Sequence, residues 1–339
     1  MHRVVRRVIN HKYTQIKPEI LQKDTIIDFD CFIKRFDDYV IIIEAGSAIT
    51  DSLVKKIQQH KVIYVLKHDM EKVNVYTTLY FKGEDDYLNI TGEEIIVYAL
   101  KLSETVSDIS TVEKRLETVY KTTSDLMRYI FERSNDQMPI DALKTCVTEI
   151  IRSVDVPINI LPLLLDILPQ YYTTYHHSVN VAFFAAIIGK YSDIPNEKLK
   201  NLAYAGLLHD IGKMHIDPIL LAKPEQLDEN EYKIIKRHSQ MGYTILEMNK
   251  IDDKDIVGGI LFHHEKLDGT GYPQGLRGKV IPKFARIIGM CDVFDALTTH
   301  RTYRQNYSSY EALLLIKQEM REQFDEVYTD TFIRLLSKS

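Results

Sequence analysis

The sequence predicts an α+β protein in which a small mixed α/β N-terminal domain (residues 1–108) and a linking helix (109–135) precede an all-helical C-terminal domain (136–339). Three observations predict this order. Short runs of β-branched residues mark the first part, apolar residues recur every three to four positions in the second, and almost the whole sequence after Pro139 has helical periodicity. A chain of 339 residues is long enough for two domains.

The N-terminal part combines strand and helix signals. Residues 39–43, 61–66 and 73–81 are short runs rich in β-branched or aromatic residues, and residues 25–33 alternate loosely between apolar and polar side chains. Residues 50–60 favour a helix whose first turn Thr50 or Asp51 can cap. We therefore expect strands at these runs and one helix before the run at 61–66.

The linking segment favours one long helix, since apolar residues recur through 107–133 without a proline. Two interpretations are equally open. The helix pairs with a second copy of the chain, giving a homodimer, or it is amphipathic and packs on its own domain. The apolar positions are Val112, Leu116, Val119, Leu126 and Ile130.

Composition and charge narrow the functional class. A net charge of −5 does not favour a nucleic acid polymer or a membrane surface as partner. No stretch approaches the roughly 18 apolar residues of a membrane span, and no apolar segment follows the basic residues 1–7, so we expect neither membrane insertion nor a signal peptide. The widely spaced Cys31, Cys146 and Cys291 argue against a disulfide framework and a zinc ribbon, and favour the cytoplasm.

After Pro139 the sequence favours helices at 179–189, 197–208 and 230–248, and another that begins at Pro282. Seven imidazole and carboxylate side chains lie within or at the ends of apolar helices: His177, His209, Asp210, His238, His263, His264 and Asp292. A single buried histidine such as His238 is more often a core residue. A buried carboxylate such as Asp292 needs a partner or a cation, and seven such groups together favour a metal centre.

The types of ligand indicate which metal and which chemistry. Imidazole and carboxylate donors without a thiolate suit iron, manganese or zinc. Two ions bridged by Asp210 would suit phosphodiester hydrolysis, because ions about 3.5–4 Å apart hold and activate a bridging water. Lys213 could place its cation on the phosphate oxygens, or it is a solvated lysine at a helix end.

A glycine-rich loop and two arginines follow as candidates for substrate binding. Four glycines within the ten residues 269–278 exclude a helix and let the backbone approach a ligand closely. Tyr272 could stack on a base, and Arg301 and Arg304 could clamp a phosphate. The alternative is a flexible surface loop with a packed tyrosine, followed by two ordinary surface arginines.

These motifs resemble the HD-GYP family, a branch of the HD phosphohydrolase superfamily, over roughly residues 140–339. The resemblance rests on His177, His209-Asp210-Ile211-Gly212-Lys213, His238, His263-His264-Glu265 with Asp268-Gly269-Thr270-Gly271-Tyr272-Pro273, Asp292, and Arg301-Thr302-Tyr303-Arg304. It implies an all-α HD-GYP helical bundle. It also implies a metal-dependent phosphodiesterase that hydrolyses cyclic di-GMP to linear pGpG, and often on to GMP.

The resemblance further implies roles for single residues. One divalent ion, most often iron or manganese, would be held by His177, His209, Asp210 and Asp292, and a second by Asp210, His238, His263 and His264. Asp210 and Lys213 would be the catalytic residues, with Lys213 at the scissile phosphate. The dinucleotide would contact Lys213, Asp268, Gly271, Tyr272, Pro273, Arg301 and Arg304.

The sequence departs from the family pattern at a few positions. Thr173 stands where some members have a glutamate that supports a third ion, so two ions are favoured over three. His215 and Glu225 lie near the expected rim of the site and could change rate or substrate preference. By association with the family, the N-terminal domain is expected to be regulatory or dimerising. Two other functions stay open: a non-catalytic receptor for cyclic di-GMP, and an HD hydrolase for another cyclic dinucleotide such as cyclic GMP–AMP.

Overall fold

The computed structural model describes residues 4–5, 13–16, 18, 21, 25, 27–35, 38–57, 59–60, 63–66, 69, 72–73, 92–132, 137–168, 173–221, 223, 226–299 and 307–337. The chain divides into two compact units. The first comprises Met1–Asn89 and Asp217–Leu227, and the second, the helical unit, comprises Ile90–Ile216 and Asp228–Ser339.

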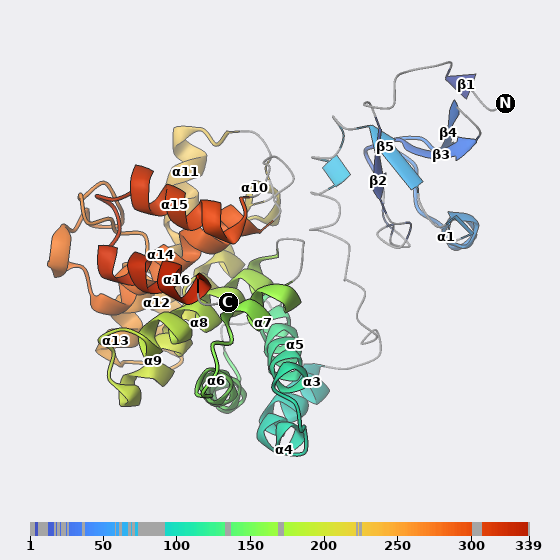
Figure 1. The fold of residues 1–339 in the computed structure, drawn as a ribbon. Coiled ribbons are helices and arrows are strands. Elements are labelled where there is room, and N and C mark those ends of the chain that lie inside the picture. Colours follow the sequence, from blue (N-terminus) through green and yellow to red (C-terminus); the bar gives the residue numbers. More distant parts are fainter. Residues whose placement is uncertain are drawn as a thin grey trace. The chain divides into compact units, whose positions relative to one another are not determined.

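The first unit is built on a five-stranded antiparallel sheet (Figure 1). Its strands are β1 (Val4–Val5), β2 (Tyr13–Ile16), β3 (Cys31–Arg35), β4 (Asp38–Ile43) and β5 (Ile63–Leu66), in the order β1-β4-β3-β5-β2, and its helices include α1 (Asp51–Ile57) and α10 (Pro218–Leu221). The fully buried Ile27, Ile49 and Ile63 are central to its core.

Most of the predicted N-terminal elements are present. The runs at 39–43 and 61–66 form β4 and β5, the loose alternation at 25–33 ends in β3, and the predicted helix is α1. Strands β1 and β2 were not predicted, because each is short and gains its stability from pairing with β4 and β5 rather than from a long local pattern. The run at 73–81 lies outside the described residues, apart from Val73.

The helical unit begins with α3 (Gly92–Leu100), α4 (Leu102–Ser107), α5 (Val112–Phe131), α6 (Ile140–Val154), α7 (Leu161–Ile167), α8 (Thr174–Lys190) and α9 (Asn196–Leu208). It continues with η3 (Ile211–His215), α11 (Glu229–Lys236), α12 (His238–Met248), α13 (Lys254–Leu261), η4 (Gly278–Val280), α14 (Lys283–Thr298), α15 (Ser309–Glu319) and α16 (Glu326–Leu336). The α+β class with a helical C-terminal part is thus confirmed.

Helix α8 forms the centre of this unit, because every residue from His177 to Gly189 is buried. A helix that is apolar on all sides must be covered by other helices. Helices α5, α9 and α14 pack on it, and Figure 1 shows the bundle that results. Gly206 of α9 allows a close approach, since a Cβ at this position would lie 3.1 Å from the Cα of Ala182. The first metal-ligand candidate, His177, therefore lies on a helix whose position is fixed by packing on all sides.

The predicted linking helix is α5, and it packs within the helical unit. Leu116, Val119, Leu126 and Ile130 are buried in the same core as α6 and α8. The unit starts at Ile90, earlier than the boundary predicted at 108, because α3 and α4 also join this core. The interpretation of α5 as an amphipathic helix on its own domain therefore describes its packing, and pairing with a second copy stays a prediction.

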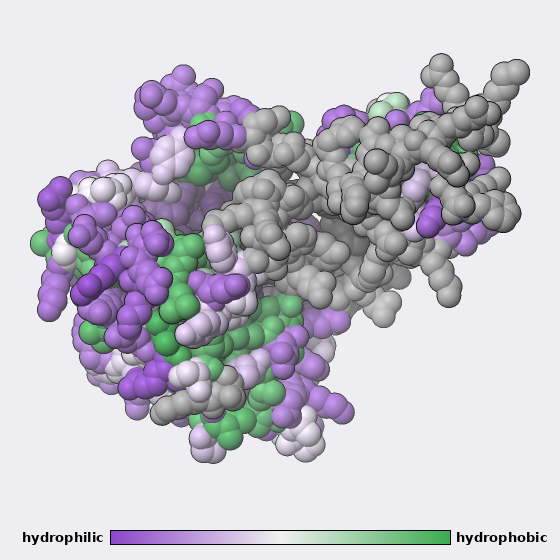
Figure 2. Space-filling view, turned by 45° about the horizontal axis from the view of Figure 1, so that its top comes forward, coloured by the Kyte–Doolittle hydropathy of each residue, from purple (hydrophilic) through white to green (hydrophobic). Residues whose placement is uncertain are grey.

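The predicted helix at 230–248 is two helices, α11 and α12, separated at Arg237. The visible face of the described helical unit mixes hydrophilic and hydrophobic residues (Figure 2). None of the described helices is both long enough and apolar enough to span a membrane.

Candidate metal centre

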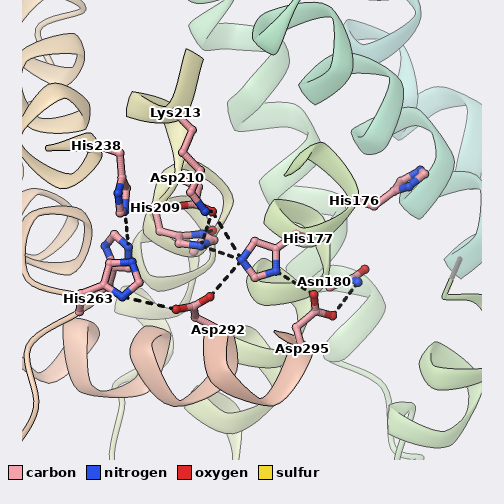
Figure 3. A network of polar contacts seen from close by, with 12 residues as sticks. His176, His177, Asn180, His209, Asp210, Lys213, His238, His263, Asp292 and Asp295 are labelled. Atoms are coloured by element: carbon pink, nitrogen blue, oxygen red, sulfur yellow. Dashed lines mark hydrogen bonds and ion pairs between the residues drawn. The ribbon is translucent and has the colours of Figure 1, made fainter. Parts of the chain in front are cut away.

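All seven predicted metal ligands come together in the helical unit. His177 lies on α8, His209 ends α9, Asp210 precedes η3, and His238 begins α12; His263 and His264 follow α13, and Asp292 lies on α14. Figure 3 shows the labelled members of this set pointing toward one another, whereas the neighbouring His176 points away. Two groups of side chains are close enough to hold an ion: His177, His209 and Asp210, and Asp210, His238, His263 and His264.

Three of the histidines use the same local geometry. The Nδ1 atoms of His209, His238 and His263 lie 2.8, 2.7 and 2.6 Å from the carbonyl oxygens of Gly206, Ile235 and Ile260, three residues earlier. Those carbonyls lie in the last turns of α9, α11 and α13, where carbonyl oxygens are left open to partners outside the regular helical ladder. Each Nδ1 therefore carries the proton and donates it, which leaves the Nε2 lone pair directed at the centre.

His177 is oriented by a buried carboxylate instead. Its Nδ1 donates to Oδ2 of Asp295 at 2.7 Å, and Oδ1 of Asp295 accepts a hydrogen bond of 2.8 Å from the amide of Asn180. The Asn180 carbonyl in turn accepts a hydrogen bond of 2.6 Å from the hydroxyl of Tyr120 on α5. This chain fixes the tautomer of His177, as a second layer of partners does for histidine ligands of metals.

The distances between the ring nitrogens fit bound cations. His177 and His209 have their Nε2 atoms 3.2 Å apart, and so have His238 and His263. Because all four Nδ1 atoms donate, neither nitrogen of a pair has a proton to share, and two lone pairs face each other. Metal–imidazole bonds of about 2.1 Å place two ligand nitrogens about 3.0–3.4 Å apart. The side chains present therefore fit bound metal ions.

Asp210 stands between the two histidine groups. Its Oδ2 lies 3.6 Å from Nε2 of His177 and 3.4 Å from Nε2 of His209, while its Oδ1 lies 3.3 Å from Nε2 of His238. Among the described residues no hydrogen-bond donor reaches the buried Oδ1. An unsatisfied carboxylate oxygen in the interior costs free energy unless a cation binds it. Asp210 can thus bridge two ions.

Asp292 also faces both groups. Its Oδ1 lies 3.1 Å from Nε2 of His177, and its Oδ2 lies 3.7 Å from Nδ1 of His264. The family resemblance assigns Asp292 only to the ion that His177 would help to hold. The position of its second oxygen next to His264 gives it a contact with the other group as well.

The environment keeps the ligands in the forms that bind metal. Burial lowers the pKa of His238 to about 4 and the pKa values of His263 and His264 well below their usual value, so these imidazoles are neutral at pH 7. Burial alone would raise the pKa of Asp210, but the neighbouring Lys213 and His209 hold it well below its usual range. Lys213 forms an ion pair with Oδ2 of Asp210. Neutral imidazoles and ionised carboxylates are the coordinating species.

One side of the centre is open to solvent. The side chains of His177, His209, Asp210 and His238 are at most 1% exposed, whereas those of His264, Lys213 and Asp292 are 20%, 17% and 14% exposed. Among the described residues of the centre, these three are therefore the ones that reach solvent.

The glycine-rich loop is held against the open side. The buried carboxylate of Glu265 accepts hydrogen bonds from the backbone N–H groups of Gln274 (2.6 Å) and Leu276 (2.8 Å). Gly271 is needed for the close approach of the two chain segments, since a Cβ there would lie 2.4 Å from the carbonyl oxygen of His264. The Tyr272 ring then stacks on the His264 ring, with centroids 4.6 Å apart.

The residues predicted to bind the substrate lie in different places in the structure. Lys213 and Tyr272 lie at the open side, and Gly271 and Pro273 belong to the same loop, whose Tyr272–Pro273 peptide bond is cis. Asp268 accepts hydrogen bonds from the backbone N–H and the hydroxyl of Thr270. These two bonds lie within the loop and stabilise its conformation. Arg301, Arg304 and Glu225 lie outside the described residues. Thr173 caps α8 by accepting a hydrogen bond from the N–H of His176, and His215 is exposed.

The sequence did not indicate Asp295, Asn180 or Tyr120 as parts of the site. Asp295 follows Asp292 by three residues on an apolar helix, and the family resemblance includes residues 294–298 but assigned Asp295 no role. Replacing Asp295 by Asn is expected to weaken metal affinity by about 10–100-fold, because the ring of His177 loses its charged partner. A competition titration with a chelator measures this. Asp193→Asn, which changes an exposed ion pair with Lys283, is the control, and an unchanged affinity in D295N would contradict the assignment.

Comparison with known proteins agrees with this geometry. The HD domain family matches residues 162–327, which include all seven ligand candidates. Residues 162–327 form an HD domain. The predicted resemblance to HD-GYP proteins is confirmed by this match together with the curated relatives and the solved structure that follow, and the matched residues span α7 to the start of α16.

Curated relatives are similar to part of this chain. A Pseudomonas aeruginosa protein named cyclic di-GMP phosphodiesterase is 38% identical over 140 residues, covering 41% of this chain and 34% of that protein. The cyclic di-GMP phosphodiesterase response regulator RpfG of Xanthomonas campestris is 35% identical, covering 44% of this chain and 40% of that protein. The 3'3'-cGAMP-specific phosphodiesterase 1 of Vibrio cholerae is 40% identical, covering 43% and 34%. The matched segments thus span 34–40% of the length of these relatives.

A solved structure shares the fold. An HDG"Y"P protein from Bdellovibrio bacteriovorus aligns with a TM-score of 0.56 at 18% identity, over 96% of this chain and 99% of that chain. At this identity the likeness concerns the fold alone.

Proposed function

We propose that this chain is a metal-dependent phosphodiesterase that hydrolyses cyclic di-GMP to linear pGpG. The observation that carries the proposal is the pair of Nε2–Nε2 approaches of 3.2 Å on either side of Asp210, which provides for two adjacent cations. Divalent ions bound there, which we expect to be two and to be iron or manganese, would supply an activated water and neutralise charge on the phosphate. The names of the curated relatives support the choice of a cyclic dinucleotide.

The residues of the chain would divide the remaining tasks. The seven ligands hold the ions, and their burial excludes bulk water from all but the open side. Lys213 is placed to contact the scissile phosphate, because its ammonium group lies next to Asp210 and remains partly exposed. Tyr272 offers an aromatic face beside His264 for a base of the dinucleotide.

The test is an assay of cyclic di-GMP turnover by protein purified without oxygen and loaded with Mn²⁺ or Fe²⁺. We expect linear pGpG, detected by chromatography, loss of turnover after treatment with a chelator, and recovery when the metal is restored. The absence of a linear product from protein shown to contain metal would overturn the proposal. Binding of cyclic di-GMP without turnover would instead support a receptor.

A second candidate substrate is 3'3'-cyclic GMP–AMP. The observation in its favour is the 40% identity to a Vibrio cholerae enzyme named as specific for this compound. Comparing kcat/KM for the two dinucleotides in the same assay decides between them.

The proposal extends to the N-terminal part, which we propose to be regulatory or dimerising. The residues of the metal centre all belong to the helical unit, whereas the sheet belongs to the other unit. The mass of the intact protein in solution measures whether two copies of the chain form a dimer. This test does not require the removal of residues 1–89.

A further inference from the structure

Helix α11 carries an aromatic and cationic surface beside the glycine-rich loop. None of its residues is buried, and the side chain of Tyr232 is 47% exposed. Its ring contacts a second tyrosine, Tyr272, and the ammonium group of Lys236. Ligand sites are often lined by aromatic side chains together with a few polar groups.

The rings form a continuous series from the metal centre to this helix. Tyr272 stacks on His264, with centroids 4.6 Å apart and planes at 28°, and it stands edge-on to His238 at 6.3 Å. Tyr232 stands edge-on to Tyr272, with centroids 6.4 Å apart and planes at 82°. Because His238 and His264 are metal-ligand candidates, a molecule whose phosphate reached the centre would bring its base to these rings.

A positive charge completes the surface. The ammonium group of Lys236 lies 4.8 Å from the ring centroid of Tyr232 and 5.8 Å from that of Tyr272, within the range of cation–π contacts. In the part of the chain that the structure describes, no carboxylate pairs with Lys236. The acidic groups Asp228 and Glu231 are engaged in the capping box at the other end of the helix. The cation therefore remains available for a ligand.

We propose that Tyr232 and Lys236, together with Tyr272, form a binding subsite for one guanine base of a cyclic dinucleotide. This inference rests on the proposed function and specifies which base the enzyme prefers. The base would stack on the exposed face of Tyr232, and the Lys236 ammonium, which has only donors, would reach the O6 and N7 acceptors of guanine. Adenine presents an amino group in place of O6, so it fits this cation less well.

The contribution of the ring is tested with Tyr232→Ala in the full-length, metal-loaded protein. We expect KM for cyclic di-GMP to rise about tenfold, with a smaller change in kcat, because stacking contributes to binding. Tyr232→Phe keeps the ring and should restore KM. Tyr310→Ala, at a 55% exposed tyrosine on α15, is the matched control. Equal KM values for Y232A and the control would overturn the proposal, and so would a failure of Y232F to restore binding.

The contribution of the charge is tested with Lys236→Met, and Lys233→Met on the same helix serves as the control. We expect K236M to raise KM for cyclic di-GMP about tenfold and to leave KM for cyclic di-AMP nearly unchanged, so that the preference for guanine falls. An equal rise for both compounds would show a contact with phosphate and overturn the assignment to the base. An unchanged preference would overturn it as well.

Direct binding separates this proposal from the proposed function. Calorimetric titration with the bisphosphorothioate analogue of cyclic di-GMP, which resists hydrolysis, measures affinity without turnover. If the wild-type protein bound the analogue but hydrolysed nothing, the proposed function would fail, and the affinities of Y232A and K236M would still decide the subsite. If the wild-type protein hydrolysed cyclic di-GMP and both variants bound the analogue normally, only the subsite would fail.

Discussion

Asp210→Asn is expected to remove bound divalent ions and to lower the rate of cyclic di-GMP hydrolysis by at least about a thousandfold. The carboxylate faces His177 and His209 with one oxygen and His238 with the other, so its loss affects both ion positions. An amide of nearly the same shape keeps the packing but loses the charge. Metal content by elemental analysis and turnover measured on the same samples check this.

Stability provides an independent measurement for the same variant. Ions that bind only the folded state raise Tm by mass action, so Mn²⁺ should raise the Tm of the wild-type protein and leave that of D210N nearly unchanged. The control is Asp330→Asn, which alters an exposed pair with Lys317 and should behave as wild type. A full complement of metal in D210N would show that Asp210 is not a shared ligand.

Gly212→Ala is expected to destabilise the fold by about 3 kcal/mol and to weaken metal binding at the same time. A Cβ at Gly212 would lie 2.0 Å from the carbonyl oxygen of His238 and 2.6 Å from the backbone nitrogen of Gly242. Both contacts are backbone atoms of α12, so no side-chain rotation can relieve them. Helix α12 must move away from η3, and it carries His238 out of the centre.

Chemical denaturation and a metal titration measure the two effects. Gly258→Ala is the control, because its Cβ would meet only the side chain of Pro282, at 3.2 Å, and should change stability little. Normal metal affinity in a destabilised G212A would show that the position of α12 does not control the site. Unchanged stability would contradict the predicted clash.

The local pattern predicted most of the helices that carry the site. The apolar run at 179–189 indicated α8, and the periodicity at 197–208 indicated α9, because a strongly apolar helix has a clear signal in the sequence alone. The break at Arg237 was not predicted, since residues 230–248 keep one helical pattern across it. The early helices α3 and α4 were also missed, as their role depends on the core they join rather than on a distinctive local pattern.

The sequence by itself determined the kind of chemistry, because seven imidazole and carboxylate side chains on apolar helices together favour a metal centre. Only the tertiary structure decided how these groups meet. It showed that helix ends at α9, α11 and α13 supply the carbonyls that orient three histidines, and that Asp295 orients a fourth. It also placed Tyr232 and Lys236 beside Tyr272, from a helix whose exposed residues resembled ordinary surface. The reason is that ligand distances depend on how helices pack, and packing joins residues that no local pattern connects.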